Sequence, residues 1–393
     1  MVLAAGEGTR LRPFTSSRPK VMVPVGNKPI LEYVVEALVA NAITEIVMVI
    51  GYRKERIMSH FADGRDFGAS IRYVEQQRQL GTAHALLAAR GELHGEFLVL
   101  PGDNIIDART VADLLATDHR PSMLVTESET PSKYGVVQVS RGSVTAIAEK
   151  PTERMGNIIS TGIYRFPPDL LETMERSVRE GERGITDALR GSIDRMDLWA
   201  ISTTGCWIDA VYPWDLIGLN AAAIGAGGTQ TAGKVEPGVI LKGPVRIGRG
   251  TRIRSGSYIE GPVCIGEGCD IGPHAVIFPS TSIGNDVQVG AFTYISQSLI
   301  MSNVILGSHS HLSHGALDAG VRVGPNCSAP SGPSYTMVEE EIFRLDKIGP
   351  MIGENSSLGS NVVISPGSVV GASCRVGDGT RVNRSLENGS VVL

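Results

Sequence analysis

The sequence predicts two folded parts of different class, an α/β domain with a mostly parallel sheet and a parallel β-helix after it. Over residues 30–128, short apolar strings alternate with amphipathic stretches of helical spacing, as in chains whose strands and helices alternate. From residue 241 onward, aliphatic residues recur every six positions, the period of a β-helix. A small-residue, glycine-rich run at 225–234 reads as a linker. The predicted boundaries are therefore 1–224, 225–234 and 235–393.

Composition narrows the class of protein. The 393 residues suffice for two domains, each with its own core. A net charge of −5 argues against a nucleic-acid polymer or an anionic membrane surface as the main partner. The apolar strings fall far short of the roughly 20 residues that a membrane span needs, and no signal-peptide pattern opens the chain. The five cysteines form no Cys-x2-Cys pair, so we expect buried, reduced thiols and a cytoplasmic protein.

The stretch 3–20, LAAGEGTRLRPFTSSRPK, holds the most informative motif. A predicted strand runs directly into Gly6 and Gly8, and two glycines let backbone N–H groups approach an anion closely. Five of the first 28 residues are basic and only Glu7 is acidic, although the whole chain is negative. The spacing matches neither a P-loop nor a dinucleotide fingerprint, which needs glycine where Leu11 stands. These residues indicate an anion site, with a glycine-rich turn among solvated charges as the alternative.

The full run closely resembles the opening of sugar-1-phosphate nucleotidylyltransferases, which couple a nucleoside triphosphate to a sugar 1-phosphate. The resemblance implies a Rossmann-like nucleotidyltransferase domain in which Arg10 and Lys20 are catalytic, with Lys20 at the α-phosphate and the sugar phosphate. The nucleotide-binding residues that it implies in this run are Leu3, Ala4, Ala5, Gly6, Gly8 and Thr9. Family members usually have several residues before this strand, so a start at Met1 leaves the strand short or is incomplete.

A second polar segment, EQQRQLGTAH at 75–84, follows the predicted strand 71–74 and leads into a predicted helix at 82–90. An amide side chain and a glycine that permits close approach can hydrogen-bond a base edge. The segment resembles the family's Gln-x2-Gln-Leu-Gly-Thr run, which implies nucleotide binding by Gln76, Gly81 and Thr82 and a uracil or thymine base at the first two. The alternative is a polar loop before a helix capped by Thr82.

Two aspartates are candidate metal ligands. Asp103 stands just past the predicted strand 97–100, where a carboxylate can cap a helix or hold Mg²⁺. The family has its first metal-binding aspartate at this position, and Trp207-Ile-Asp209 resembles its second metal segment. The resemblance therefore implies a Mg²⁺ site formed by Asp103 and Asp209, with triphosphate oxygens completing the shell.

The segment 134–151 predicts a β-hairpin that turns at Arg141 and Gly142. It resembles the family's sugar-binding insertion, and residues 160–164 resemble a strand that lines the sugar pocket. The sugar-phosphate contacts that the resemblance implies are Gly135, Glu149, Lys150 and Thr161. The family usually has asparagine where Ser160 stands, so the sugar substituent that is recognised stays open.

The second half is organised by its repeat. Aliphatic residues recur without a miss at Leu241, Ile247, Ile253, Ile259, Ile265, Ile271, Ile277, Ile283, Val289 and Ile295. Each is expected to point inward, so that stacked coils bury one continuous core. The phase then slips to Leu299 and Ile305 and resumes with Leu317 and Val323.

Residues 330–351 are a predicted insertion that contains an acidic, helix-like segment at 338–345, and period six returns at Ile352. The repeat resembles left-handed hexapeptide β-helices, many of which form trimers, so we expect a homo-oligomer built on trimers. In relatives of this type, the β-helix serves assembly or regulation or, in bifunctional enzymes, acetylates a sugar amine.

Three of the eight histidines, His309, His311 and His314, cluster at the phase slip. The run from His311 to His314 resembles the His-Leu-Ser-Tyr of the bifunctional enzymes, which implies His311 as the base that deprotonates an amine attacking acetyl-CoA. His314 replaces the tyrosine, and the family's downstream Gly-Thr-Ile-x2-Asn run is missing from this sequence. The alternatives are surface histidines and a metal site.

The sequence as a whole predicts nucleotidyl transfer from UTP or dTTP to glucose-1-phosphate or N-acetylglucosamine-1-phosphate, with Mg²⁺ as cofactor and pyrophosphate as product. The resemblance at His311 implies a second activity, acetyl-CoA-dependent acetylation of glucosamine-1-phosphate, beside the alternatives given above. The competing interpretations are a non-catalytic regulatory or assembly paralogue and a hexapeptide acyltransferase with a vestigial first half. The joint presence of Arg10, Lys20, Asp103 and Asp209 argues against the regulatory paralogue. The intact phosphate loop argues against the acyltransferase with a vestigial first half.

Overall fold

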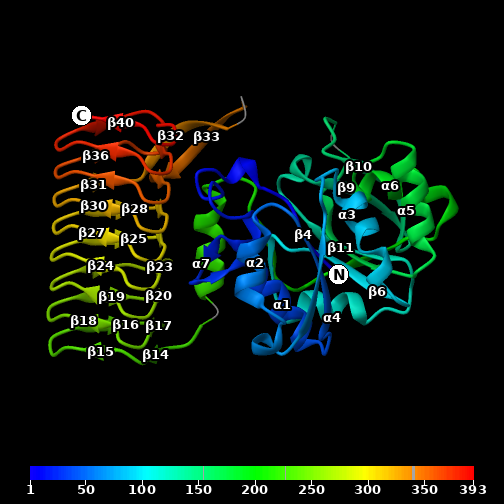
Figure 1. Ribbon diagram of the computed structural model, residues 1–393, viewed down its shortest axis with the longest axis horizontal. Helices are drawn as coiled ribbons and strands as arrows, with labels where there is room; N and C mark the ends of the chain where they lie inside the picture. The colour runs from blue at the N-terminus through cyan, green and yellow to red at the C-terminus, as the bar shows by residue number, and fades with distance from the viewer. Residues whose placement is uncertain (154, 226, 339–340) are drawn as a thin grey trace. The chain divides into compact units, whose positions relative to one another are not determined.

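The computed structural model describes residues 1–153, 155–225, 227–338 and 341–393. The chain divides into two compact units (Figure 1). The first consists of Met1–Glu7, Arg18–Met22 and Ile30–Ile208, and the second of Gly8–Ser17, Val23–Pro29 and Asp209–Leu393. Position 226 of the predicted linker and positions 339–340 of the predicted insertion lie outside the described residues.

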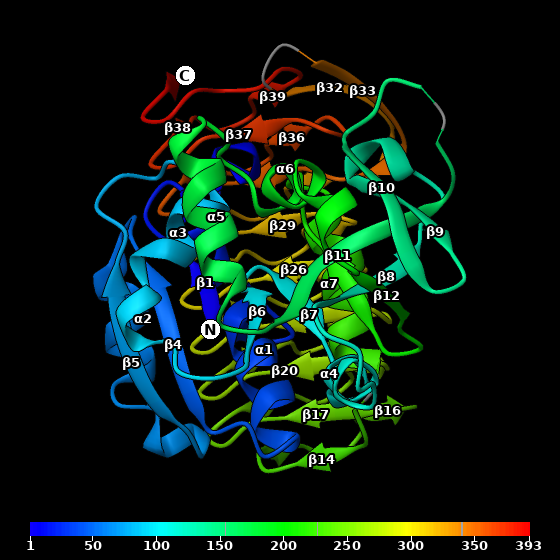
Figure 2. The same cartoon turned by 90° about the vertical axis from the view of Figure 1, so that its right-hand side faces the viewer.

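The first unit is built on a nine-stranded sheet of order β5-β4-β1-β6-β11-β8-β12-β10-β9, which can be followed in Figure 2. Its strands are β1 (Val2–Ala4), β4 (Glu45–Ile50), β5 (Ser70–Glu75), β6 (Phe97–Pro101), β8 (Ser122–Glu127), β9 (Gly135–Ser140), β10 (Ser143–Glu149), β11 (Ile158–Phe166) and β12 (Trp199–Ser202). Strands β5, β4, β1 and β6 run parallel, whereas β11 is antiparallel to both β6 and β8. The predicted Rossmann-like α/β sheet is therefore confirmed, with a parallel half formed by β5, β4, β1 and β6 and a half in which antiparallel pairings predominate.

Helices cover both faces of this sheet. They are α1 (Ile30–Ala40), α2 (Lys54–Phe61), α3 (Thr82–Ala88), α4 (Ala108–Leu115), α5 (Leu170–Arg179) and α6 (Ile185–Arg190). One buried cluster joins the sheet to α1, α2 and α4, and a second joins it to α3, α5 and α6. Because successive strand residues face opposite sides, Val2 and Ala4 lie in the first cluster and Ala5 lies in the second.

The predicted hairpin is present as β9 and β10, which pair antiparallel. Its two turn residues, Arg141 and Gly142, have φ of 50° and 88°. Positive φ at both positions is characteristic of a two-residue turn whose twist matches that of the flanking strands. The unit also contains β7 (Asn104–Ile106), which pairs with β13 (Trp207–Asp209), and the 3-10 turn Lys20–Met22.

The second unit is a left-handed parallel β-helix whose coils stack as in Figure 1. Its first sheet contains β14 (Gln230–Thr231), β17 (Val245–Ile247), β20 (Val263–Ile265), β23 (Thr281–Ile283), β26 (Leu299–Ile300), β29 (Ala316–Leu317), β34 (Met351–Ile352) and β37 (Val369–Val370). Its second contains β15 (Lys234–Val235), β18 (Arg252–Ile253), β21 (Asp270–Ile271), β24 (Gln288–Val289), β27 (Ile305–Leu306), β30 (Arg322–Val323), β35 (Ser357–Leu358), β38 (Arg375–Val376) and β40 (Val391–Val392). Its third contains β16 (Ile240–Lys242), β19 (Tyr258–Glu260), β22 (Val276–Ile277), β25 (Tyr294–Ser296), β28 (His311–Ser313), β31 (Ser328–Ala329), β36 (Val363–Ile364) and β39 (Arg381–Val382).

The inward residues of the period-six repeat form one continuous core, as predicted, but the predicted positions at the phase slip are wrong. Ile300 and Leu306 face the core in place of Leu299 and Ile305. The physical reason is the strand register: Ile265 pairs with Ile283, eighteen residues on, whereas Ile283 pairs with Ile300, seventeen residues on. The next turn therefore keeps the ladder aligned by shortening one corner.

The insertion carries an antiparallel hairpin of β32 (Gly332–Val338) and β33 (Glu341–Ile348), so the predicted helix-like segment is wrong. Phe343 and Leu345 are partly buried while Arg344 and Asp346 are exposed, a period of two that belongs to a strand. The unit also contains α7 (Asp215–Gly225), β2 (Pro24–Val25), β3 (Lys28–Pro29) and the 3-10 turn Thr9–Leu11. Four of the five free cysteines are buried, as expected, and Cys206 is partly buried.

Candidate functional site

The predicted nucleotide residues Leu3, Ala4 and Ala5 stand at the carboxyl end of the central strand β1. The Ala5 carbonyl accepts hydrogen bonds from the backbone N–H of Tyr52 at 3.2 Å and from Nε2 of Gln79 at 2.9 Å. Because β1, β4 and β6 are parallel, their carboxyl ends share one edge of the sheet, where ligands of such folds bind. Gly6 follows there and is exposed.

Lys20 and Asp103, predicted separately, form an ion pair at this edge. The Lys20 Nζ lies 2.7 Å from the Asp103 Oδ2, and the two side chains are 14% and 33% exposed. Gly102 donates its N–H to the Leu3 carbonyl at 2.8 Å, which holds the segment before Asp103 against β1. An added Cβ at Gly102 would come within 2.9 Å of that carbonyl oxygen, so the close approach requires glycine. A partly exposed cation and a carboxylate thus stand together beside the strand that leads into the glycine loop.

The predicted base-binding residues lie together around the start of α3. The Gln76 side chain is buried, and its Nε2 donates to the Gly81 carbonyl at 3.1 Å. Gly81 precedes the helix with φ 106° and ψ 176°, a conformation that is essentially confined to glycine. The helix N-cap is therefore Gly81, and Thr82 instead accepts the backbone N–H of Ile185 on its Oγ1 at 3.0 Å.

Two residues at this segment were missed by the sequence analysis. The Arg183 carbonyl accepts the Ala83 N–H at 3.0 Å, and an added Cβ on Gly81 would approach the same oxygen to 2.2 Å. The His84 Nδ1 lies 3.0 Å from Nε2 of Gln76. Arg183 is a hundred residues away in sequence, so no local pattern could have placed it here. His84 lies within the segment that was singled out, on the first turn of α3.

The predicted sugar-phosphate residues occupy the second part of the sheet. Gly135 pairs with Glu149 across the hairpin, and an added Cβ on Gly135 would lie 3.1 Å from the Glu149 carboxylate. The Glu149 residue as a whole is exposed, but desolvation by the protein around its carboxyl raises its pKa. Lys150 follows with a positive φ of 43°. The hairpin therefore presents a carboxylate and an ammonium side by side at its end.

Thr161 lies inside the sheet, where its side chain has protein partners. Its Oγ1 donates to the Leu124 carbonyl at 2.8 Å, and its own carbonyl accepts the Trp207 Nε1–H at 3.2 Å. These bonds fix β11 and the indole that begins β13. Because the Thr161 side chain is buried and hydrogen-bonded, its role here is to hold β11 and Trp207 in place.

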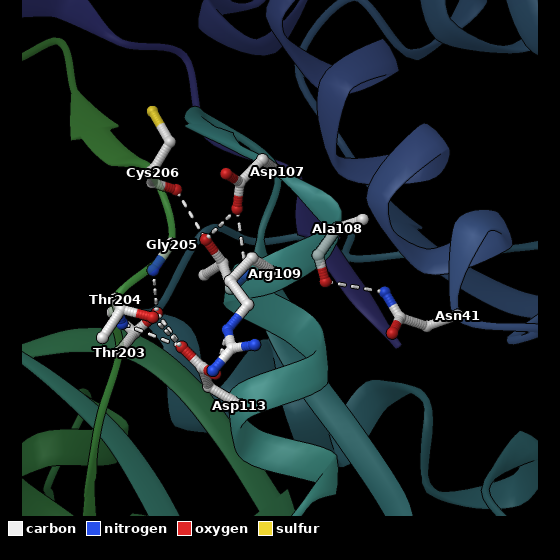
Figure 3. A network of polar contacts seen from close by, with 10 residues as sticks. Asn41, Asp107, Ala108, Arg109, Asp113, Thr203, Thr204, Gly205 and Cys206 are labelled. Carbon is white, nitrogen blue, oxygen red and sulfur yellow. Dashed lines mark hydrogen bonds and ion pairs between the residues drawn. The ribbon is translucent and has the colours of Figure 1, made fainter.

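The segment that leads to Trp207 and Asp209 is fixed to helix α4 (Figure 3). Asp113 accepts hydrogen bonds from the Thr203 Oγ1 at 3.0 Å and the Thr204 backbone N–H at 2.8 Å. Partial burial would raise the pKa of Asp113, but these bonds and the nearby Arg109 guanidinium lower it overall. At the head of the helix, Thr110 donates its Oγ1–H to the Cys206 carbonyl at 2.6 Å. The approach to β13 is thereby held rigid.

The remaining nucleotide residues belong to the second unit. Gly8 adopts a left-handed conformation with φ 74° and precedes the 3-10 turn that carries Thr9 and Arg10. Its carbonyl accepts the Leu11 N–H at 3.0 Å and the Thr15 Oγ1–H at 2.8 Å. This closes the loop on itself and orients its glycine. Asp209, the last residue of β13, is also in this unit.

His311 and His314 line a cavity of about 410 Å³ on the β-helix. Its lining residues are Phe278, Pro279, Ser280, Tyr294, Ser296, Gln297, His311, Ser313, His314, Ser331 and Lys347. Burial lowers the pKa of His311, and burial together with the Lys347 charge lowers that of His314 to about 4. Nδ1 of His314 is buried and has no hydrogen-bond partner among the described residues. The predicted base and its neighbour are therefore neutral imidazoles in one cavity.

His309 lies elsewhere, stacked on the Phe292 ring at 5.0 Å. Within the described ranges, no group of three or more His, Cys, Asp or Glu side chains is arranged to hold a metal ion, so the metal alternative for the histidines gains no support. Among the helices that the structure describes, none has the length and apolar character needed to cross a membrane.

Comparison with known proteins agrees with these geometries. The nucleotidyl transferase family model matches residues 1–222, and the GMPPB C-terminal domain model matches residues 259–332. The Bifunctional protein GlmU of Methanococcus aeolicus is 33% identical over 100% of this chain and 96% of its own length. A glucose-1-phosphate thymidylyltransferase of Streptomyces antibioticus is 34% identical over 65% of this chain and 74% of its own.

A solved structure extends the comparison to the fold. A Bacillus anthracis protein provisionally described as a glucose-1-phosphate thymidylyltransferase has a TM-score of 0.53 and 29% identity, covering 56% of this chain and 93% of that one. The GlmU relatives of Methanococcus aeolicus and Methanococcus maripaludis match the whole of this chain and 96% of their own length, at 33% and 36% identity. The chain therefore belongs to the nucleotidyl transferase family, as a sugar-1-phosphate nucleotidylyltransferase with a C-terminal left-handed β-helix.

Proposed function

We propose that this enzyme uses UTP or dTTP and either glucose-1-phosphate or N-acetylglucosamine-1-phosphate, and that residues 1–224 carry this activity. The observation that carries the proposal is the Lys20–Asp103 ion pair at the carboxyl edge of β1, the strand that leads into the glycine loop. The pyrimidine preference rests on Gln76 and Gly81. A purine is larger, whereas the Gly81 backbone and a buried amide suit the single imide edge of uracil or thymine. The names of the GlmU and thymidylyltransferase relatives support the same substrate class.

The reaction needs no covalent intermediate. An oxygen of the sugar 1-phosphate attacks the α-phosphorus in line, the new P–O bond forms as the bond to the β-phosphate oxygen breaks, and pyrophosphate leaves with the electron pair. Lys20 would stand between the α-phosphate and the sugar phosphate, and Arg10 on the triphosphate, so that both spread the transition-state charge. Glu149 and Lys150 would hold the sugar hydroxyls and its phosphate. Positioning and charge then supply most of the rate.

Asp103 and Asp209 would hold the Mg²⁺ ion. Their carboxylates are the hard oxygen donors that this ion prefers, and Asp103 is partly exposed at the edge where phosphates would bind, so the donor set fits. When bound, the ion neutralises phosphate charge during transfer. The Lys20 ammonium, 2.7 Å from the Asp103 Oδ2, fixes the orientation of that carboxylate.

The test is pyrophosphate release with Mg²⁺ from UTP, dTTP, ATP and GTP, each paired with glucose-1-phosphate, N-acetylglucosamine-1-phosphate and glucosamine-1-phosphate. Release with a pyrimidine triphosphate and one of the first two sugars is expected. Release only with ATP or GTP would refute the base assignment. Absence of release with every pair would favour the regulatory paralogue.

A second activity, acetyl transfer from acetyl-CoA to the amine of glucosamine-1-phosphate, is proposed for residues 235–393. The observation that favours it is the 410 Å³ cavity, which is of ligand-binding size and holds His311 and His314. Burial lowers the pKa of His311, so its imidazole is neutral near pH 7 and can accept the ammonium proton. The amine nitrogen then attacks the thioester carbonyl, and CoA leaves as the thiol after taking up a proton.

Release of free thiol from acetyl-CoA with glucosamine-1-phosphate tests this second activity, with His311→Ala as the variant. An unchanged rate in His311→Ala would rule out the base role. His309→Ala is the matched control, because His309 is in the same histidine cluster in sequence but stacks on Phe292 outside the cavity.

We also propose that the β-helix mediates homo-oligomerisation, with trimers as the unit. It exposes large apolar side chains, among them Ile240 at 50%, Phe292 at 55% and Tyr294 at 37%. Rows of exposed apolar side chains mark interaction surfaces. Sedimentation equilibrium gives the mass directly, and a monomer at micromolar concentration would contradict the proposal.

A further inference from the structure

Two short N-terminal segments fold with the β-helix unit, although the chain between and around them belongs to the first unit. These segments are Gly8–Ser17, which carries Arg10, and Val23–Pro29. Both are attached to coils of the β-helix by specific side-chain contacts. The nucleotide loop therefore has supports that come from the far end of the sequence.

The first segment is attached at the coil that follows β34. The Ser17 Oγ–H donates to the Glu354 Oε2, a bond between residues 337 positions apart. One residue earlier in that coil, an added Cβ on Gly353 would lie 2.9 Å from the Cβ of Pro13, so the loop packs directly on this turn. Leu11, Phe14 and Thr15 of this segment are fully buried. The loop is thus closed at one end by Gly8 and Thr15 and fixed at the other by Glu354.

The second segment is attached further along the β-helix. Asn27, at the turn between β2 and β3, donates its Nδ2–H to the Ile283 carbonyl at 2.7 Å. Gly26 donates its N–H to the Asn220 Oδ1 at 3.0 Å, and that oxygen also accepts the Ser282 Oγ–H at 2.6 Å. Two separate anchors therefore fix the chain on either side of Lys20.

We infer that Glu354 and Ser17 are positioning residues for nucleotidyl transfer: through the Ser17–Glu354 hydrogen bond, the β-helix sets the geometry of the loop that binds the triphosphate. The inference rests on the proposed role of Gly8 to Arg10 in triphosphate binding. A loop that is not preorganised must be ordered when the ligand binds, and this entropic cost lowers the affinity for the triphosphate. Neither Ser17 nor Glu354 needs to touch substrate for this effect.

The repeat itself provides a matched control. Ile265 and Ile352 occupy the same place in the first sheet, linked through the ladder Ile265, Ile283, Ile300, Leu317 and Ile352. Glu267 and Glu354 each stand two residues after them, at the same corner of their coils. Glu267 pairs with Arg249 at 3.0 Å on an exposed surface. Glu267→Ala therefore removes the same chemical group from the same backbone setting without touching the loop.

The experiment measures kcat and KM for the pyrimidine triphosphate and for the sugar 1-phosphate in the full chain. Ser17→Ala and Glu354→Ala are each expected to raise the KM for the triphosphate at least about fivefold, with the KM for the sugar 1-phosphate and kcat changed less than about twofold. Ser17→Thr, which keeps the hydroxyl, and Glu267→Ala should stay within about twofold of the parent. The double variant should raise the KM for the triphosphate by less than the product of the two single effects, because both substitutions remove one shared bond.

Arg10→Ala separates this inference from the proposed function. If Arg10→Ala raises the KM for the triphosphate while Ser17→Ala and Glu354→Ala do not, the inference is wrong and the proposed function stands. If Arg10→Ala leaves that KM unchanged too, the assigned role of the loop fails and the inference fails with it. Thermal unfolding of each variant is measured alongside, and equal losses of kcat in Glu354→Ala and Glu267→Ala would show a general effect on the β-helix and overturn the inference.

Discussion

Position 81 requires glycine for two reasons, its backbone conformation and a close steric contact. Alanine substitutions at Gly81, Gly95 and Gly91 can separate the two. At Gly81, the φ of 106° with ψ of 176° costs about 1–3 kcal/mol for a residue with a Cβ. The added Cβ would also approach the Arg183 carbonyl oxygen to 2.2 Å, so that carbonyl must move and weaken its bond from the Ala83 N–H, worth about 1 kcal/mol. Gly81→Ala should therefore destabilise the first unit by about 2–4 kcal/mol.

Two other glycines of the same unit provide controls. Gly95 has a positive φ of 66°, and an added Cβ would meet no described atom within 4 Å, so Gly95→Ala should cost about 1 kcal/mol. Gly91 has neither a positive φ nor a described neighbour within 4 Å, so Gly91→Ala should stay within about 0.5 kcal/mol of the parent. Urea unfolding curves followed by circular dichroism give all three values. A Gly81→Ala loss no greater than that of Gly95→Ala would refute the steric part of the reasoning.

Gly81→Ala also tests the base site. The substitution shifts the backbone that is expected to face the pyrimidine, so the KM for the triphosphate should rise at least about tenfold, equivalent to about 1.4 kcal/mol. The KM for the sugar 1-phosphate should change less than about twofold. A variant that is destabilised yet keeps the parental KM for the triphosphate would show that Gly81 serves folding alone.

Three further predictions concern other residues. Lys20→Ala and Asp103→Ala should each lower turnover in pyrophosphate release at least about tenfold. Near-normal turnover in both variants would contradict the roles proposed for Lys20 and Asp103. Asp107→Ala removes the cap that accepts the Thr110 N–H at 2.9 Å, so urea unfolding should show a loss of about 1 kcal/mol, whereas Asp107→Asn should lose less than half of that. For His314, whose pKa is lowered to about 4, the unfolded chain binds a proton below pH 6.5 that the folded protein does not. Stability should therefore fall by about 1 kcal/mol from pH 7 to pH 5, a value reduced for its partial exposure, and His314→Gln should remove that slope in urea midpoints.

The elements that the sequence could predict are those whose signal is local. The strands at 46–50, 71–74 and 97–100 were visible because each is a short apolar string between polar turns, and each is present as a strand. The period of six predicted the β-helix because every coil repeats the same inward position. Lys20 and Asp103 were singled out separately, each from its own motif, and the ion pair that joins them at 2.7 Å was not predicted.

What could not be predicted depends on contacts between distant segments. The Arg183 carbonyl against Gly81 and the Glu354 carboxylate against Ser17 are set by the fold, and neither pair has a local pattern. The run of glutamates before Ile342 favours a helix by intrinsic propensity, but pairing with β32 overrides it. The first two contacts have no local signal in the sequence. In β33, strand pairing prevails over a local preference for helix.

The irregularities of the repeat gather at one edge of the β-helix, and that edge is where the cavity lies. The spacing from Ile295 to Ile300 is five positions instead of six, and so is the spacing from Leu312 to Leu317. The cavity is lined by residues of these two shortened corners, including Gln297 and His314, and by Lys347 of the hairpin that interrupts the repeat in the next coil. Gln297 and His314 both adopt positive φ, 45° and 49°, as do residues at other corners of the β-helix, for example Asp286 and Phe292.

Departures from a local rule that persist without stabilising the core are expected at functional sites. The shortened corners, the hairpin and the two histidines all contribute to the lining of one cavity. The phase slip that the repeat prediction misplaced therefore lies at the cavity proposed for acetyl transfer. His309 does not belong to this surface. Its ring stacks on Phe292 at 5.0 Å, the same distance at which Phe292 stacks on His274, so the stack of rings is regular there.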